Sequence, residues 1–391
     1  MGAQRAPAIR DSAGIRIVTN GATTVPARRL DPRPILSIGD DESGTTFGTV
    51  AGAIRLSDGS VVVADGKAGE LRLFSAAGQL VRGVARRGEG PGDVKNFAGL
   101  SRLPGDTVLL WDNRLSRLTR FTASGQLVRT APVDRLPPVK LGGGATSTPW
   151  ITLLGVLADG SLIGSYRLGL YNPPTGLYPD TAFVVRVVPP GGISTVARLL
   201  VGETYIFESV TTKFLTDGAR PFTTAGLIAT GPSSFWHSDG RRFELREYSS
   251  RGALKTMIRL ARTPTPVTPK EISVFRANLI AAAKTEMASE PAMRDNFVKH
   301  AELTGAWLTF PATHPAFTGL VVASTGEVWA REYGDSTKAQ RWHVFAPTGV
   351  RTATIEIPAG VEPLEIGRDY VLARVRNEDD VESVRVYRYQ R

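Results

Sequence analysis

The 391-residue chain contains no cysteine and only four histidines. Without cysteine there can be no disulfide bond, no thiolate metal site and no cysteine nucleophile. The histidines are far apart in the sequence, so no local pair is available to bind a metal, and each is interpreted as a surface or turn residue. They are His237, His300, His314 and His343.

Long apolar runs and long basic runs are also missing. No stretch approaches the ~18 apolar residues that a membrane helix needs, so no transmembrane span is predicted. The net charge is +10, but the arginines occur singly or in pairs, with no run of five. Nucleic-acid-binding proteins usually concentrate basic residues on one face, so nucleic acid is not an expected partner. The first seven residues lack the charged and apolar regions of a signal peptide, and none is expected in the chain as given.

What the chain does contain is an internal repeat. Residues Gly52–Arg82 and Gly99–Arg129 align without a gap at an offset of 99 − 52 = 47, and 13 of the 31 aligned positions are identical. Both units end in the sequence GQLVR. Self-similarity at a period of 40 to 50 residues is typical of a propeller or solenoid.

The first unit divides into four short strands separated by turns. Turn residues such as Ser57-Asp58-Gly59-Ser60 and Ala77-Gly78 lie between β-branched or alternating segments. Four antiparallel strands in about 45 residues are typical of a β-propeller blade. The predicted strands are Ala53–Leu56, Val61–Ala64, Glu70–Ser75 and Gln79–Ala85.

Weaker copies of the unit follow. A third blade is predicted from the hairpin Leu157–Leu162 with outer strands Ala182–Val188 and Ser194–Leu200. The fourth, fifth and sixth blades are predicted around Phe243–Tyr248, around Leu320–Trp329 with Trp342–Phe345, and around Leu364–Gly367, Tyr370–Val375 and Ser383–Tyr389.

The sixth unit ends before a fourth strand, and the segment Pro34–Gly39 is predicted to supply it. Such closure removes an open sheet edge and joins the two ends of the chain. The expected fold is therefore all-β: one six-bladed β-propeller of four-stranded antiparallel blades over residues 34–391. Residues 1–33 are expected to form an N-terminal extension, with an edge strand at Gly14–Asn20.

One segment, residues 268–302, is helical by propensity. Thr268-Pro269-Lys270-Glu271 fits a capping box, and Ser289-Glu290-Pro291 is expected to divide the segment into two helices. This helical insertion lies between blades four and five. Packing against the propeller is the favoured interpretation, and a lid or partner surface is the other.

These motifs resemble a family of bacterial six-bladed β-propellers related to NHL-repeat proteins. The resemblance covers nearly the whole chain, and members are commonly exported, many as lipoproteins, although no lipobox cysteine is present here. It rests on RDSAGIRIV, RLSDGSVVVADGKAGELRLF, RRGEGPGD, HPAFTGLVVASTGEVWAREY, RWHVFAPTG and DYVLARVRN with VRVYRY.

In such a blade, the second-to-third connection and the connection to the next blade emerge on one face, which we call the rim. The rim is the predicted binding surface, because loops on a rigid scaffold commonly carry function. Asp65 and Asp112 recur at equivalent turns and are interpreted as turn caps rather than metal ligands. The candidate site residues are Asp40, Asp41, Glu42, Arg86, Arg87, Glu89, Asp93, Glu378, Asp379 and Asp380.

No catalytic motif accompanies this scaffold. There is no GxSxG sequence, and GEGPGD at Gly88–Asp93 lacks the GK[ST] ending of a phosphate-binding loop. The favoured hypothesis is a non-enzymatic, exported, monomeric propeller that binds a protein, peptide or glycan through its rim, without a cofactor. The alternative is a lactonase- or lyase-like enzyme with an axial Ca²⁺ ion, as in related propeller folds. The expected location is periplasmic or extracellular, with cytoplasmic as the alternative.

Overall fold

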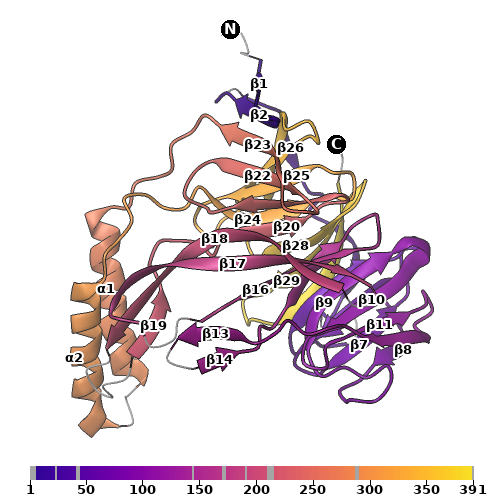
Figure 1. Ribbon diagram of the computed structural model, residues 1–391, viewed down its shortest axis with the longest axis horizontal. Coiled ribbons are helices and arrows are strands. Elements are labelled where there is room, and N and C mark those ends of the chain that lie inside the picture. Colours follow the sequence, from indigo (N-terminus) through magenta and orange to yellow (C-terminus); the bar gives the residue numbers. More distant parts are fainter. Residues whose placement is uncertain are drawn as a thin grey trace.

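The computed structural model describes residues 6–22, 24–40, 45–142, 145–169, 173–189, 192–208, 215–286 and 290–389. In these ranges the chain is mostly β-structure, folded into antiparallel sheets, with two helices at one edge of the molecule (Figure 1).

Two four-stranded sheets contain the sequence repeat, in the order predicted for it. Every turn of the first unit coincides with a turn signal in the sequence. The predicted strand positions are confirmed within one residue, except that β5 begins three residues before the predicted Ala53. The first sheet contains β5 (Val50–Arg55), β6 (Val61–Asp65), β7 (Glu70–Phe74) and β8 (Leu80–Ala85). The second contains β9 (Phe97–Leu103), β10 (Thr107–Asp112), β11 (Arg117–Phe121) and β12 (Leu127–Pro132).

The third to sixth sheets repeat this antiparallel order of four strands, and the third, fourth and fifth add further strands at their outer edges. The third contains β15 (Thr152–Val156), β16 (Leu162–Arg167), β17 (Gly176–Val188), β18 (Gly192–Glu208) and β19 (Leu215–Ala219). The fourth contains β20 (Leu227–Thr230), β21 (Ser234–Ser238), β22 (Glu244–Ser249), β23 (Leu254–Leu260), β2 (Ile15–Asn20) and β1 (Ala8–Ser12). The fifth contains β24 (Phe317–Val322), β25 (Val328–Glu332), β26 (Gln340–Phe345), β27 (Arg351–Ile357) and β3 (Ala27–Arg29). The sixth contains β28 (Val361–Ile366), β29 (Tyr370–Arg376), β30 (Glu382–Arg388) and β4 (Pro34–Ile38).

The first strands of successive sheets contact one another. β5 contacts β9, and the contacts continue through β15, β20, β24 and β28 and return to β5. At one of these approaches, a Cβ atom added to Gly155 would lie 2.8 Å from the Cβ of Thr230, so only glycine fits there. Sheets that radiate from such a centre and bury both faces against their neighbours define a β-propeller.

The N-terminal segment is hydrogen-bonded into three sheets. β4 pairs antiparallel with β30, so Pro34–Gly39 supplies the fourth strand of the sixth sheet, as predicted. β2 pairs parallel with β23 and pairs with β1 on its other side. The strand predicted at Gly14–Asn20 therefore forms, but β1 rather than β2 lies at the edge of the sheet. The parallel pairing of β3 with β27 was not predicted from the sequence.

Two strands of the third sheet are much longer than predicted. β17 has 13 residues and β18 has 17, and the added lengths form an arm that also pairs with β19 (Figure 1). The predicted strands, Ala182–Val188 and Ser194–Leu200, cover only the part of this pair nearest its hairpin turn. The pairing instead continues through an irregularity next to Asp180, which only the partner strand could reveal. A short hairpin of β13 (Val139–Gly142) and β14 (Ala145–Ser147) precedes this sheet.

The helices α1 (Pro269–Glu286) and α2 (Pro291–Trp307) lie between β23 and β24 in the sequence. The predicted capping box is present: Thr268 donates its N–H to Glu271 at 2.8 Å, and Glu271 donates its own N–H back to the Thr268 hydroxyl at 3.2 Å. The ring of Trp307 lies 5.3 Å from that of Tyr205 and 6.0 Å from that of Phe207, so the helices pack against the arm (Figure 1).

Buried carboxylates join neighbouring elements at the rim. Asp65 accepts N–H groups from Lys67 and Ala68 in its own turn and from Gly48 and Thr49 in the segment that leads into β5. Its exposed fraction is 1%. Each of these hydrogen bonds gives a partner to a backbone N–H group that would otherwise be buried without one. The turn-cap interpretation of Asp65 is therefore confirmed.

Asp112 occupies the same place in the second sheet. It accepts the N–H of Lys95 at 2.6 Å and that of Leu115 at 3.0 Å, so it joins the loop entering β9 to its own turn. The turn-cap interpretation is confirmed here too.

The Asp65→Ala substitution should lower the free energy of unfolding by about 3 kcal/mol, because several buried N–H groups lose their acceptor. Urea denaturation of the wild type and the variant measures this difference. Asp134→Ala, which truncates an exposed carboxylate, is the control. If Asp65→Ala lowered the free energy of unfolding no more than the control does, the role of Asp65 in joining its turn to the segment that enters β5 would be contradicted.

A second buried network joins the fourth and fifth sheets. Glu332 accepts hydrogen bonds from Arg262 at 2.7 Å and from the Nε2 of His343 at 3.1 Å. His343 and His237 lie on buried strands, so the surface or turn positions predicted for them are wrong, and burial lowers the pKa of both. Burial opposes ionisation of Glu332, but His343 and Arg262 outweigh it and hold the pKa of this carboxyl below its usual value.

Stability should therefore fall on acidification. Below pH about 6.5, histidines in the unfolded state bind protons, whereas the buried histidines of the native state stay neutral. The free energy of unfolding therefore falls by at most about 1.4 kcal/mol per pH unit for each histidine. Below pH about 4.5, Glu332 is protonated in the unfolded state but still ionised in the native state, which lowers the free energy of unfolding further. Thermal melts from pH 8 to pH 5 should show a falling Tm, with a shallower fall in His343→Gln. A Tm that stays constant over this range would contradict the conclusion that His343 and His237 are buried in their neutral form.

Candidate functional site

The main candidate site is a cavity of about 670 Å³ on the rim, between the fifth and sixth sheets. It lies beside the connections from β25 to β26 and from β27 to β28, next to the end of β29. We call it the first cavity. Its size is within the usual range of small-molecule pockets.

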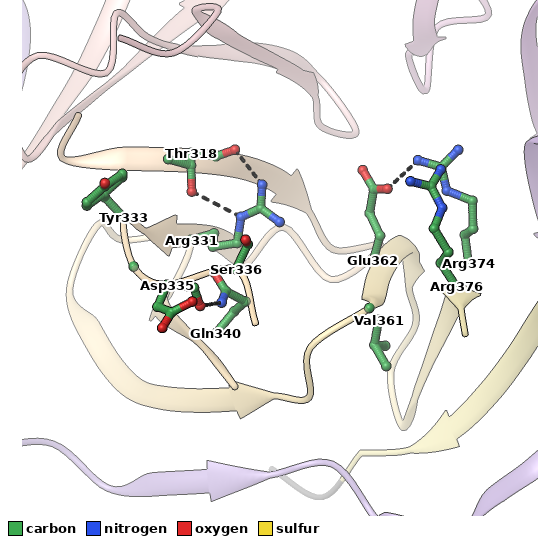
Figure 2. Close-up of a pocket in the computed structure, with 12 residues that line it drawn as sticks. Thr318, Arg331, Tyr333, Asp335, Ser336, Gln340, Val361, Glu362, Arg374 and Arg376 are labelled. Atoms are coloured by element: carbon green, nitrogen blue, oxygen red, sulfur yellow. Dashed lines mark hydrogen bonds and ion pairs between the residues drawn. The ribbon is translucent and has the colours of Figure 1, made fainter. Parts of the chain in front are cut away.

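Polar side chains face each other across the first cavity (Figure 2). On one side, Arg331 donates to the hydroxyl of Thr318 at 3.1 Å and to its carbonyl at 2.9 Å. Ser336 and Gln340 lie beside it and offer further hydrogen-bonding groups. This side of the cavity can therefore both donate and accept hydrogen bonds.

The opposite side is formed by alternate residues of β29. Arg374 pairs with Glu362 (Figure 2). Arg376 donates to Glu382 at 2.7 Å. About half of the Arg376 side chain is exposed, whereas Glu382 is only 6% exposed. The buried carboxylate therefore anchors a guanidinium whose other donors can reach a ligand.

The charges around this cavity are well defined at neutral pH. Burial opposes ionisation of Glu382, but hydrogen bonds from Arg376 and from the N–H of Val50 hold its pKa below the usual value. The hydroxyl and N–H of Thr337 lower the pKa of Asp335. With three arginines lining the cavity against the carboxylates of Asp335 and Glu362, its lining is net positive.

One predicted cluster borders this cavity. Glu378, Asp379 and Asp380 form the exposed tip of the loop that follows Arg376, and Asp380 lies 3.7 Å from the Arg376 guanidinium. The side chain of Asn377 caps the loop through the N–H groups of Asp379 and Val381. The three acids are thus brought to the border of the cavity but do not line it.

A second predicted cluster lies at the joint of the first two sheets. Arg86 and Asp93 are 3.5 Å apart and line a separate cavity of about 570 Å³, while Glu89 pairs with Lys95. Arg87 donates to the carbonyl of Lys67 at 2.7 Å.

The backbone of this loop is held from the neighbouring strand. Arg117 donates to the carbonyls of Glu89, Gly90 and Asp93 at 2.8 to 2.9 Å. These contacts give the GEGPGD loop a structural role at the joint. The remaining predicted cluster is divided: Asp40 follows β4, and Asp41 and Glu42 lie outside the described residues.

Sequence reasoning missed the arginines of the first cavity. The +10 charge was interpreted as diffuse, because Arg331, Arg374 and Arg376 are scattered along the chain. The only local indication was the alternation of Arg374 and Arg376, which places both side chains on the same face of one strand. Their approach to Arg331 depends on how the fifth and sixth sheets are placed side by side.

Within the described ranges, no group of three or more histidine or acidic residues is arranged to hold a metal ion. Neither helix has the length and apolar character needed to cross a membrane.

No protein-family model and no curated protein matches this chain. Solved structures do resemble it, and three of them are each 12% identical to this chain. A Bacteroides fragilis protein described by name as exported has a TM-score of 0.45 and covers 94% of this chain and 100% of its own. A gluconolactonase from Xanthomonas campestris has a TM-score of 0.42, with 94% and 98% covered. The calcium-binding protein regucalcin from Agrobacterium tumefaciens has a TM-score of 0.41, with 94% and 97% covered. At this similarity they assign no activity to this chain.

Proposed function

We propose that the protein is an exported, non-enzymatic six-bladed β-propeller whose rim binds a ligand carrying carboxylate and hydroxyl groups. The blade count is supported by the closed series of contacts among the first strands of the six larger sheets. Binding at the rim is supported by the first cavity, which is lined mainly by polar and charged side chains from strand ends and the connections between them.

The observation that carries this proposal is the pair Arg374 and Arg376 on β29. Both guanidiniums reach the cavity, and each is held by a carboxylate that leaves part of its hydrogen-bonding capacity available. Arginine binds carboxylates through short, charge-assisted bonds. Across the cavity, Ser336, Gln340 and Asp335 can donate to and accept from hydroxyl groups.

The Arg376→Gln substitution should weaken binding of a carboxylate ligand. Trigalacturonic acid is a suitable probe, and isothermal titration should show a Kd raised about tenfold to a hundredfold, since bonds to charged groups contribute about 1.5–3 kcal/mol. Arg129→Gln removes the same charge from an exposed position on β12 and should leave Kd unchanged. An equally tight complex with the methyl ester of the probe, or with Arg376→Gln, would contradict the proposal.

The competing hypothesis is a calcium-dependent lactonase- or lyase-like enzyme with an axial ion. The names of two similar structures, a gluconolactonase and a calcium-binding protein, fit this alternative at least as well as they fit binding. It requires oxygen ligands gathered around one ion.

Calcium titration with thermal unfolding separates the two hypotheses. A specific ion that binds the native state raises Tm in proportion to RT ln(1 + [Ca²⁺]/Kd). The binding hypothesis expects the same small effect from calcium as from magnesium at equal ionic strength. A saturable rise in Tm with calcium alone would favour the enzyme.

A further inference from the structure

A second, smaller cavity of about 290 Å³ opens on the same rim. It is formed by the arm of the third sheet, the connection from β21 to β22, and the segment Pro311–Pro315 that leads into β24. We call it the second cavity.

The second cavity repeats the pairing of guanidinium and carboxylate groups seen in the first, with two arginines and two acids in its lining. The carboxylate of Glu203 bridges two guanidiniums, 2.8 Å from Arg220 and 3.0 Å from Arg241. Arg241 is half exposed, as Arg376 is in the first cavity. Asp239, Thr223 and the neighbouring threonine add acceptors and hydroxyl groups. Each cavity therefore offers an exposed guanidinium anchored by a less exposed carboxylate.

The two cavities meet at one pair of stacked rings. His314 lines the second cavity and Tyr333 lines the first, and their ring centroids are 4.3 Å apart with planes at 12°. The pair is held in place from both sides. The N–H of Tyr333 donates to the carbonyl of Ala316, and the Nε2 of His314 lies 2.9 Å from the carboxylate of Glu271 on α1.

We propose that the two cavities are consecutive subsites for one linear acidic polysaccharide, which passes over Tyr333, whose ring stacks on the buried His314. This inference rests on the proposed function and deepens it. A polymer of identical acidic sugars presents the same carboxylate and hydroxyl groups at regular intervals, and the rim presents matching sets in neighbouring cavities. The arginines and the hydroxyl and amide side chains in the two linings offer hydrogen-bond partners to the carboxylate and hydroxyl groups of such a polymer.

Chain length is the variable that tests this arrangement. A ligand that occupies both cavities gains affinity because its second contact is intramolecular. Galacturonic acid octamer should therefore bind at least about tenfold more tightly than the trimer, with little further gain for longer chains. The trimer is expected to occupy the larger first cavity.

Substitutions in the second cavity should affect only the long ligand. Arg241→Gln should weaken octamer binding about tenfold and leave trimer binding unchanged. Asp239→Asn should strengthen octamer binding, because it removes a negative charge and keeps the oxygen that caps the N–H of Arg241. Arg242→Gln, at the exposed neighbouring position outside the cavity, is the matched control. Thermal melts establish that each variant is folded.

The outcomes separate this inference from the proposed function. Equal affinity for trimer and octamer, or an equal loss for both in Arg241→Gln, overturns the two-cavity arrangement and leaves the first cavity as the binding site. Trimer binding that does not depend on Arg376 overturns the proposed function itself. Tighter binding of octaglutamate than of the octasaccharide overturns the choice of a polysaccharide in favour of an acidic peptide.

Discussion

Buried carboxylates that accept backbone N–H groups hold the joints of this propeller together. A sheet in such a fold buries both faces, so each strand that enters a new sheet carries donors that must find partners away from water. Asp65, Asp112 and Glu382 supply these partners, and each bonds to backbone from a neighbouring segment as well as to groups near its own turn. A short side chain with two acceptor oxygens can satisfy several donors at once, which hydrophobic packing cannot do.

The same constraint positions the first cavity. Glu382 joins the sixth sheet to the first by accepting the N–H of Val50, and its other oxygen holds the guanidinium of Arg376. Arg374 likewise donates to the carbonyl of Val50 while its second nitrogen reaches Glu362. The positive side of the cavity is thus an extension of a structural joint. Its guanidiniums are preorganised, so a ligand does not have to pay for ordering them.

The sequence predicted the repeated strands because their pattern is local. The turns around Asp58 and Gly78, the capping box at Thr268 and the break near Pro291 depend on residues within a few positions of one another. The arm of the third sheet was not predicted, because Pro179 indicates a turn unless its partner strand is known. The rim was predicted as the binding face on the basis of its acidic and glycine-rich loops, and the arginines of the first cavity, which lie on strands, were not among the predicted residues.

The sequence by itself therefore determined the elements: strands of period two, turns at glycine and aspartate, and a capped helical segment. The tertiary structure decided which side chains meet. Glu271, His314 and Tyr333 come from a helix, a loop and a strand end, yet they form one contact series at the junction of the two cavities. Propensity and periodicity act over a few residues, whereas this junction depends on the register and packing of whole sheets.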